Sequence, residues 1–359
     1  MSQKTIAPRK DISALDAKFE AQKLSFAPVA FQCARVLRDK GILKLISDAG
    51  KEGISAREIH EKSGVSLYGV KVLLDMAASL MLVDYIEEER YVLMKTGYFI
   101  LNDKMSNVNM DFIHDVCYQG LFYLGEAIDK QKPSGLKVFG EWETIYDALS
   151  ELPEKVRESW FAFDHFYSDN AFPKALEIVF SEKPAKLFDV GGNTGRWALE
   201  CVKYDPDVEV TILDLPGQLR DAEKTAKENG FENRIKGYEI NLLDENQKFP
   251  EGADAIWMSQ FLDCFSEEQI LSILNRAREA MDSGTKLYIM ETYWDRQRFE
   301  AATYSLNATS LYFTAMANGN SRMYHSKDMI KQVHRAGLVV DQDTDEVGLG
   351  HTLFRCKLA

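Results

Sequence analysis

The sequence predicts an α/β protein in which a mostly helical, winged-helix domain precedes a doubly wound, Rossmann-like parallel sheet with a terminal antiparallel hairpin. Three observations predict this class. Short apolar strands alternate with helical segments from residue 183 onward, which is typical of a parallel sheet. Two predicted strands joined by a glycine turn lie at the carboxy-terminal end. Predicted helices followed by a short hairpin lie in the amino-terminal part. The domains expected from these changes are residues 1–105, 106–182 and 183–359.

The amino-terminal domain is predicted from helix start signals and apolar periodicity. Ser55 and Glu58 have the spacing of a capping box, and Ser66 stands where a helix N-cap is expected. The expected helices cover residues 28–41, 54–64 and 66–82, and two short strands around an acidic turn occupy 82–93. A helix, a helix-turn-helix and a hairpin in this order indicate a winged helix.

The middle segment, residues 106–182, is predicted to be helical and carries many aromatic side chains. Such rings most often form a protein core. The alternative interpretation is that some of them line an aromatic substrate pocket beside the next domain. We assign Phe163 and Tyr167 from this segment, and Tyr312 and Met316 from a later one, to that pocket.

The carboxy-terminal part is predicted to form the sheet. Its expected strands are residues 186–190, 208–213, 234–240, 255–259 and 286–290. Because helices separate these strands, a parallel, doubly wound sheet is the simplest arrangement. The closing runs, 339–347 and 352–358, flank a glycine turn and are expected to add an antiparallel strand at one edge.

Composition excludes several classes of protein. The 359 residues are 45% hydrophobic and 28% charged, as in a soluble globular protein with a core. A net charge of −13 disfavours binding to nucleic acid or to an anionic membrane, because both need a positive surface. We expect no transmembrane helix and no signal peptide, since no apolar run is long enough for either. The five cysteines are scattered, so we expect a cytoplasmic protein without a disulfide framework or a metal site.

The motif with chemical content follows the first strand of the sheet and reads Asp189-Val-Gly-Gly-Asn-Thr-Gly195. In doubly wound sheets ligands bind beyond the carboxyl ends of the strands, where small residues let them approach the backbone. A P-loop would need Lys at position 196, which is Arg196, and a GxGxxG loop would need glycines at 193 and 196. The remaining interpretation is a loop that binds S-adenosylmethionine (SAM). Asp214 ends the second strand, where a carboxylate can accept hydrogen bonds from both ribose hydroxyls.

With these motifs, the chain resembles the SAM-dependent O-methyltransferases of the plant caffeate and acetylserotonin type, a family that also has bacterial members. The resemblance covers nearly the whole chain, including the winged-helix region, the glycine loop, Asp214-Leu-Pro216, Asp254-Ala-Ile-Trp-Met258 and Asn318-Gly-Asn-Ser-Arg322. It implies a SAM-methyltransferase sheet, SAM as the cofactor with S-adenosylhomocysteine (SAH) as its product, a homodimer formed through the amino-terminal domain, and a small-molecule acceptor.

The resemblance also implies roles for individual residues. Gly191 and Gly192 approach the methionine part of SAM, and Asp214 binds its ribose. Asn241 and Leu242 fall where the family has Asp-Met or Asp-Phe beside the adenine, so that contact is altered but can still hydrogen-bond. The implied cofactor-binding residues are Asp189, Gly191, Gly192, Gly195, Asp214, Leu215, Asn241, Leu242 and Ser259, the last where some members have Lys.

The catalytic segment departs from the family's pattern. Members read Leu-His-Asp-Trp after the fourth strand, with the His as general base, whereas this chain places Asp263 at the position of the His. The acid that orients the His in many members is retained as Glu291. An ordinary Asp is a weak base for a phenol, although burial and a neighbouring carboxylate would raise its pKa. Asp263 can therefore act as the base or as a ligand for a cationic or hydroxylated substrate group. The alternatives are that it caps the helix that begins near Ser266 or is merely solvated.

Three further residues complete the candidate site, which are Asp164, His165 and His325. Asp164 matches an acceptor-contacting Asn of the family. His165 and His325 are the histidines that can substitute as the base, with a structural or surface role as the alternative for each. The remaining histidines show no metal-ligand spacing, so we expect no metal.

Three functions follow from these patterns. The first is in-line transfer of the SAM methyl group to a hydroxyl of a small aromatic or conjugated molecule. The second keeps SAM but changes the reaction to C- or N-methylation or to non-methyl chemistry, because Asp263 replaces the His. The third is a DNA-binding regulator, but its candidate recognition helix carries only Lys71 as a basic residue, opposed by Asp75, which is too little for phosphate contacts. We therefore interpret the winged helix as a dimerisation element whose apolar helices, especially residues 26–45, pack against a second copy.

Overall fold

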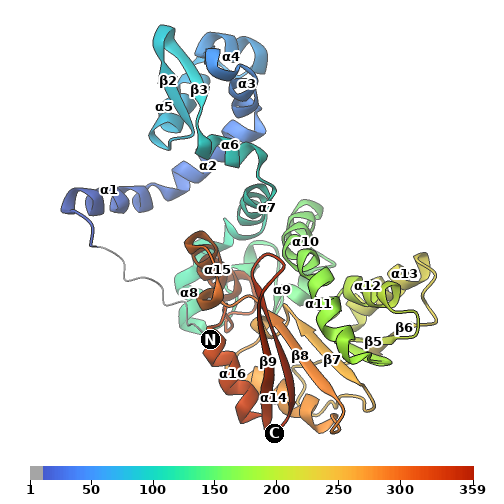
Figure 1. Cartoon of the computed structure of the whole chain (residues 1–359). Helices are drawn as coiled ribbons and strands as arrows, with labels where there is room; N and C mark the ends of the chain where they lie inside the picture. Colours follow the sequence, from blue (N-terminus) through green and yellow to red (C-terminus); the bar gives the residue numbers. More distant parts are fainter. Residues whose placement is uncertain (1–10) are drawn as a thin grey trace. The chain divides into compact units, whose positions relative to one another are not determined.

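The computed structural model describes residues 11–359 (Figure 1). Within them the chain forms two compact units, one that ends at Ile113 and one that begins at His114. None of the helices in this range has the length and apolar character needed to cross a membrane.

The amino-terminal unit is mostly helical and has a small antiparallel sheet. Its elements are α1 (Ala14–Ser25), α2 (Ala27–Asp39), α3 (Ile42–Asp48), β1 (Ile54–Ser55), α4 (Ala56–Ser63), α5 (Leu67–Ser79), β2 (Val83–Ile86), β3 (Arg90–Leu93), α6 (Lys95–Asn102) and α7 (Lys104–Phe112), with the strands in the order β1-β3-β2. The predicted caps are confirmed, because Ser55 and Glu58 form a capping box at α4 and the Ser66 hydroxyl accepts the Gly69 N–H at α5. The predicted hairpin is confirmed as β2 and β3.

The carboxy-terminal unit begins with four helices that precede the sheet. They are α8 (Leu124–Lys130), α9 (Ile145–Ala148), α10 (Glu154–Ser168) and α11 (Phe172–Val179). Five aromatic residues of this segment lie on α10, which are Trp160, Phe161, Phe163, Phe166 and Tyr167.

A seven-stranded sheet forms the centre of this unit and has the order β6-β5-β4-β7-β8-β10-β9. Its strands are β4 (Lys186–Val190), β5 (Glu209–Asp214), β6 (Ile235–Glu239), β7 (Ala255–Ser259), β8 (Lys286–Glu291), β9 (Leu338–Val347) and β10 (His351–Leu358). The first five are parallel, which confirms the predicted doubly wound sheet. The closing hairpin contributes both of its strands rather than one, because β10 pairs with β8 and β9 then takes the edge.

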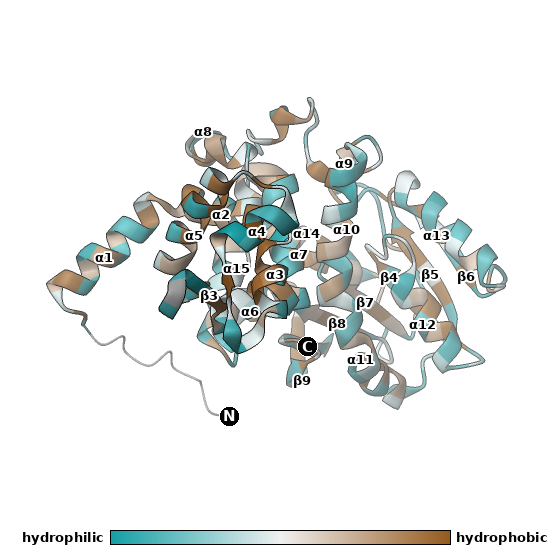
Figure 2. Cartoon of the chain, turned by 90° about the horizontal axis from the view of Figure 1, so that it is seen from above, coloured by the Kyte–Doolittle hydropathy of each residue, from teal (hydrophilic) through white to brown (hydrophobic). Residues whose placement is uncertain are grey.

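Helices cover both faces of this sheet (Figure 1). Those between and after the strands are α12 (Arg196–Tyr204), α13 (Pro216–Glu228), α14 (Glu267–Glu279), α15 (Glu300–Tyr312) and α16 (Ser326–Arg335). Side chains of a strand alternate between the faces, so Trp257 packs with α11, α12 and α13 while Ile256 packs with α14 and α16. Figure 2 shows β5 and β7 in the brown of hydrophobic residues and α13 with teal, hydrophilic stretches.

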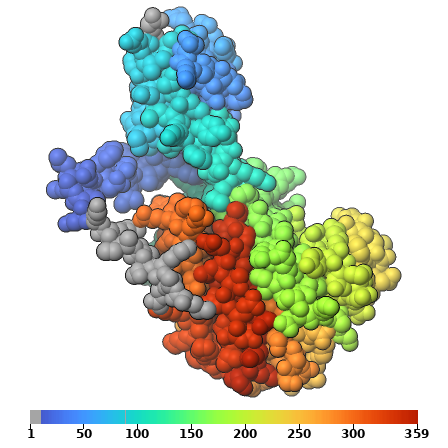
Figure 3. All heavy atoms as spheres, viewed as in Figure 1, coloured from blue at the N-terminus to red at the C-terminus, as the bar shows by residue number. Residues whose placement is uncertain are grey.

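The turn of the closing hairpin packs on the junction of α10 and α11. Gly348 has φ +60°, and a Cβ atom there would lie 2.7 Å from the backbone nitrogen of the buried Ala171. In Figure 3 the red end of the chain lies beside the green segment that holds α10. The hairpin and α10 therefore hold each other in place next to the carboxyl ends of the strands.

Candidate functional site

The predicted site residues gather where the parallel strands end. Asp214, Ser259 and Glu291 are the last residues of β5, β7 and β8, and the glycine loop follows β4. These four strands are neighbours in the sheet. Because the carboxyl ends of parallel strands lie at the same edge, the predicted residues share one ligand-binding edge.

The glycine loop is compact and exposes its backbone. Gly191, Asn193 and Gly195 all have left-handed φ angles, between 50° and 78°. The Gly191 N–H donates to the Leu213 carbonyl oxygen at 2.9 Å, which fixes the loop to the end of β5. A Cβ atom at Gly192 would lie 2.5 Å from Asp189 Oδ2, so no other residue type fits that position without rearrangement.

Two carboxyl groups flank this loop. Asp189 is 2% exposed, its Oδ2 atom has no hydrogen-bond partner, and burial together with the charge of Asp214 raises its pKa to about 8. Asp214 accepts the N–H groups of Asn193 and Leu215 at 2.8 and 2.7 Å, and burial raises its pKa to about 6. The unpartnered oxygen of Asp189 and the carboxylate of Asp214 can accept hydrogen bonds from hydroxyl and ammonium groups. They would repel a phosphate. These acceptor oxygens therefore fit the ribose hydroxyls and the cationic part of SAM.

The segment after β6 is held by an arginine that the sequence analysis missed. Arg276 donates to the carbonyl oxygens of Leu242, Asp244 and Gln247 at 2.6, 3.0 and 3.0 Å. Gln247 in turn accepts the N–H of the exposed Asn241 at 2.7 Å, and Leu242 is buried. The available signal was a charged residue at an apolar position of the amphipathic helix α14, since such a residue needs buried partners.

The turn after β7 brings the catalytic segment next to the glycine loop. A Cβ atom at Gly191 would lie 2.2 Å from the Phe261 ring. Glu291 Oε1 accepts the N–H groups of Phe261 and Leu262 at 3.0 and 2.8 Å. Gln260 has a left-handed φ of 46°, and its Oε1 atom lies 3.2 Å from Nε2 of the fully buried His351. Glu291 of β8 and His351 of β10 thus hold this turn in one conformation.

Asp263 lies in the single helical turn Leu262–Cys264 and is 5% exposed. Burial raises its pKa to about 6. The interpretation of Asp263 as a helix cap is wrong, because Ser266 caps α14 and forms a capping box with Gln269. The alternatives of a base and of a ligand for a cationic or hydroxylated group stay open.

Glu291 faces Asp263 from the end of β8. It is 1% exposed, its Oε2 atom has no hydrogen-bond partner, and burial together with the Asp263 charge raises its pKa well above the usual range. The Glu291 side chain therefore holds a proton while Asp263 is the more acidic of the two.

Asp164 and His165 are adjacent on α10 but have different surroundings. Burial and the charge of Asp263 raise the pKa of Asp164 to about 7. The ring of His165 lies 5.6 Å from that of Phe161, its Nε2 atom has no partner, and burial lowers its pKa to about 4. The charged residues that act on His165 are Arg196 and Asp169 rather than Asp263. Asp263 therefore acts on Asp164 and not on His165.

The predicted pocket residues are split between surface and core. Phe163 and Tyr167 are half-buried on α10 with ring centroids 5.1 Å apart. Met316 is fully buried, and the hydroxyl of the buried Tyr312 accepts the Trp160 indole N–H at 2.7 Å. This bond, which spacing alone does not indicate, fixes α10 to the last residue of α15.

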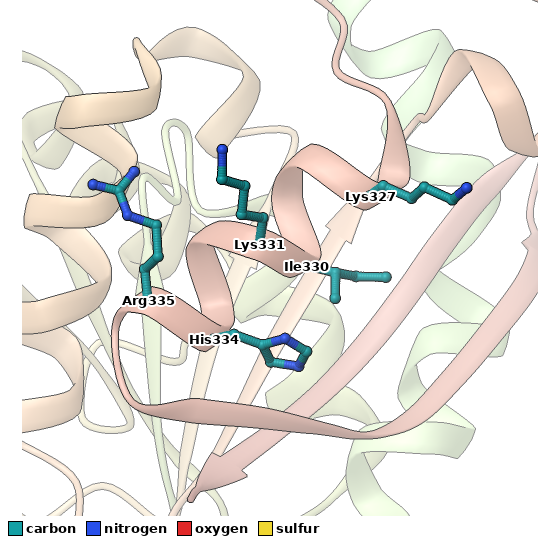
Figure 4. A pocket seen from close by; sticks show the side chains of 5 residues that line it. All are labelled: Lys327, Ile330, Lys331, His334 and Arg335. Carbon is teal, nitrogen blue, oxygen red and sulfur yellow. The ribbon is translucent and has the colours of Figure 1, made fainter.

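A separate surface hollow of about 460 Å³ lies along α16 (Figure 4). Its lining residues are Lys327, Ile330, Lys331, His334 and Arg335. None of the predicted site residues is among them. Among residues 11–359, no group of three or more His, Cys, Asp or Glu side chains is arranged to bind a metal ion.

Comparison with known proteins agrees with this arrangement. A family model described as an O-methyltransferase domain matches residues 123–338, and one described as a Dimerisation2-like domain matches residues 18–91. L-tyrosine C(3)-methyltransferase of Streptomyces lavendulae is 22% identical over 316 residues, which are 87% of this chain and 84% of that protein. Acetylserotonin O-methyltransferase of Gallus gallus is 24% identical over 287 residues, 74% of this chain and 78% of that protein. The crystal structure of the S-adenosylmethionine-dependent methyltransferase SibL has the same fold, with a TM-score of 0.71 at 22% identity and coverage of 94% and 98%.

Proposed function

We propose that this chain, which belongs to the O-methyltransferase domain family, transfers the methyl group of SAM to a hydroxyl of a small aromatic or conjugated molecule. Membership of the family makes it a SAM-dependent methyltransferase. The observation that carries the proposal is the juxtaposition of the glycine loop with the turn that bears Asp263, since Phe261 of that turn packs on Gly191. A methyl donor on the loop and an acceptor on the turn would then be neighbours.

The residues at the sheet edge supply a set of cofactor contacts. Asp214 and the adjacent Leu215 are proposed to bind the ribose, and Gly191 and Gly192 to let the methionine part approach the backbone. We assign Asn241 and Leu242 to the adenine, and Asp189, Gly195 and Ser259 to the walls of the same site. Bound SAM supplies an electrophilic methyl group carried on a sulfonium.

Asp263 is proposed as the group that receives the proton of the acceptor hydroxyl. Its raised pKa, about 6, makes it a stronger base than an exposed Asp while leaving it mostly ionised at neutral pH. Glu291 positions it by holding the two preceding backbone N–H groups. Holding the acceptor oxygen in line with the methyl group supplies the larger share of the rate.

A second candidate reaction is C-methylation of an aromatic ring. The relative that covers 87% of this chain bears the name of a C(3)-methyltransferase, and this chain has Asp263 where O-methylating members have His. An NMR spectrum of the product made with ¹³C-methyl SAM separates the two reactions, because a methoxy carbon and an aryl methyl carbon resonate in different regions.

The remaining parts of the chain receive supporting roles. We assign residues 1–105 to dimerisation, 106–182 to a helical linker that contributes to the acceptor pocket with Phe163 and Tyr167, and 183–359 to the SAM-binding domain. A homodimer is supported by α1, which buries none of its residues against this chain. The five cysteines are all free, as in cytoplasmic proteins, and the charge of −13 supports an enzyme that does not bind nucleic acid.

Calorimetric titration of SAM and SAH tests the proposal. Asp214→Ala removes a carboxylate that accepts charge-assisted hydrogen bonds, so the Kd for both ligands is expected to rise by roughly 10- to 100-fold. Asp207→Ala, at an exposed loop position before β5, is the matched control and should bind normally. Absence of binding by the unaltered chain would overturn the proposed function.

A further inference from the structure

Asp164 is a carboxyl group without a partner. It makes no hydrogen bond or ion pair with any residue between 11 and 359, although it is only partly exposed. It lies one helical turn beyond Trp160, whose indole N–H is bonded to Tyr312, so α10 is fixed at this point. The side chain therefore occupies a rigid position with its hydrogen-bonding capacity unused.

The charges that act on Asp164 come from the turn after β7, from the end of its own helix and from α12. Asp263 acts on it from the turn after β7, and Asp169 from the end of α10. The one cation that acts on it is Arg196 at the start of α12, which already forms an ion pair with Asp169 at 2.9 Å. Behind Asp263 lies Glu291, 99% buried and with Oε2 unpartnered. Arg196 thus neutralises Asp169, whereas Asp164 and Asp263 have no cation of their own within residues 11–359.

We propose that the acceptor carries a protonated amino group that binds Asp164 while its reacting hydroxyl faces Asp263, so that the substrate class is a hydroxylated aromatic amine. This rests on the proposed function and names the substrate class of that site. An ammonium donates to carboxylates and neutralises their mutual repulsion, and burial strengthens both effects. An anionic acceptor would meet the same carboxylates with the opposite sign.

Binding of such a cation is linked to proton release. The raised pKa of Asp164, about 7, means that this side chain is partly protonated at neutral pH without ligand. An ammonium beside it favours the charged form and lowers its pKa, so a fraction of a proton leaves the protein. A neutral acceptor of the same shape has no such effect.

The test uses the full chain saturated with SAH and three catechols of the same shape. These are dopamine as the cation, 4-ethylcatechol as the neutral analogue and 3-(3,4-dihydroxyphenyl)propanoate as the anion. Calorimetry at pH 7 in two buffers of different ionisation enthalpy measures Kd and proton release together. We expect dopamine to bind at least about tenfold more tightly than 4-ethylcatechol and with release of protons, and the anion to bind most weakly.

Variants on α10 separate a binding role from a structural one. Asp164→Asn is expected to bring the affinity ratio of dopamine to 4-ethylcatechol close to one and to abolish proton release, whereas Asp164→Glu keeps a preference for the cation. Glu158→Gln, an exposed position of the same helix, should leave the ratio unchanged.

Several results would overturn the inference. The inference is wrong if the three catechols bind with equal affinity, if dopamine does not bind the SAH-loaded chain, or if the preference for dopamine survives Asp164→Asn. In each of these cases the proposed function stands. Failure of SAH itself to bind overturns the proposed function, and the inference with it.

Discussion

Glu291 holds the backbone residue that precedes Asp263, because its Oε1 atom accepts the Leu262 N–H at 2.8 Å. The same oxygen accepts the Phe261 N–H at 3.0 Å. The last residue of β8 therefore determines the path of the turn after β7 and, through it, where the Asp263 carboxyl points. We propose that Glu291, which stands where the resemblance places the family's acid, acts as a positioning residue for Asp263.

Replacing Glu291 by Gln is expected to preserve this turn. Burial and Asp263 raise the pKa of Glu291 well above its usual range, so the side chain already carries a proton, and an amide oxygen accepts the same two N–H groups. Glu291→Ala leaves two buried amides without an acceptor and should lower the free energy of unfolding by about 2 to 4 kcal/mol. Urea unfolding measures both variants. A Gln variant as unstable as the Ala variant would argue against the protonated form.

The methyl-transfer rate is expected to rise with pH through about 6. Asp263 accepts a proton only as a carboxylate, and burial raises its pKa to about 6, so protonation below that pH removes the base. Asp263→Asn should lower kcat by roughly 100- to 10,000-fold and remove the rise, with an unchanged Kd for SAM as the control. Steady-state kinetics across this pH range measure the effect. A variant with nearly normal kcat would exclude Asp263 as the base.

Asp189 is expected to contribute a fall in stability as pH rises. Its pKa is about 8 in the folded chain and near 4 in the unfolded chain, so the folded state binds the proton more tightly. The stability that this proton contributes is fully present below pH 4 and is lost progressively up to about pH 8. Asp189→Asn should flatten the dependence by up to roughly 1 kcal/mol per pH unit. Urea unfolding at several pH values tests this, with Asp207→Asn as the exposed control. Identical slopes for Asp189→Asn and the unaltered chain would show that Asp189 has an ordinary pKa.

The sheet, its helices and its ligand-binding edge were predictable because they depend on local patterns. The alternation of short apolar strands with helical segments located β4 to β8. The capping-box spacing of Ser266 and Gln269 was a better signal for the start of α14 than Asp263. The contacts that hold the catalytic turn are not local. Gln260 and His351 are 91 positions apart, and nothing in the spacing of either residue indicates that they meet. The same holds for Arg276 and Leu242, which only the folded chain brings together.

The exposed apolar side chains of α1 predict that the protein is a dimer in solution. Leu15 and Phe19 lie one helical turn apart and are 81% and 59% exposed, and α1 buries none of its residues within the chain. Size-exclusion chromatography with light scattering should give twice the chain mass of 40.9 kDa. Phe19→Asp should shift the mass toward one chain, whereas Ala21→Asp, on another face of the helix, should not. If Phe19→Asp remains fully dimeric, α1 lies outside the interface.

Arg276 is expected to control SAM affinity without contacting the reaction. Its guanidinium bonds three carbonyl oxygens of residues 242–247, and a lysine keeps the charge but cannot span all three. Arg276→Lys should therefore loosen the segment that follows Asn241 and raise the Kd for SAM by about tenfold, while kcat at saturating SAM changes little. Arg278→Lys, exposed on the same helix, is the control. Calorimetry and steady-state kinetics separate the two effects, and a normal Kd in Arg276→Lys would mean that the segment after β6 does not hold the adenine.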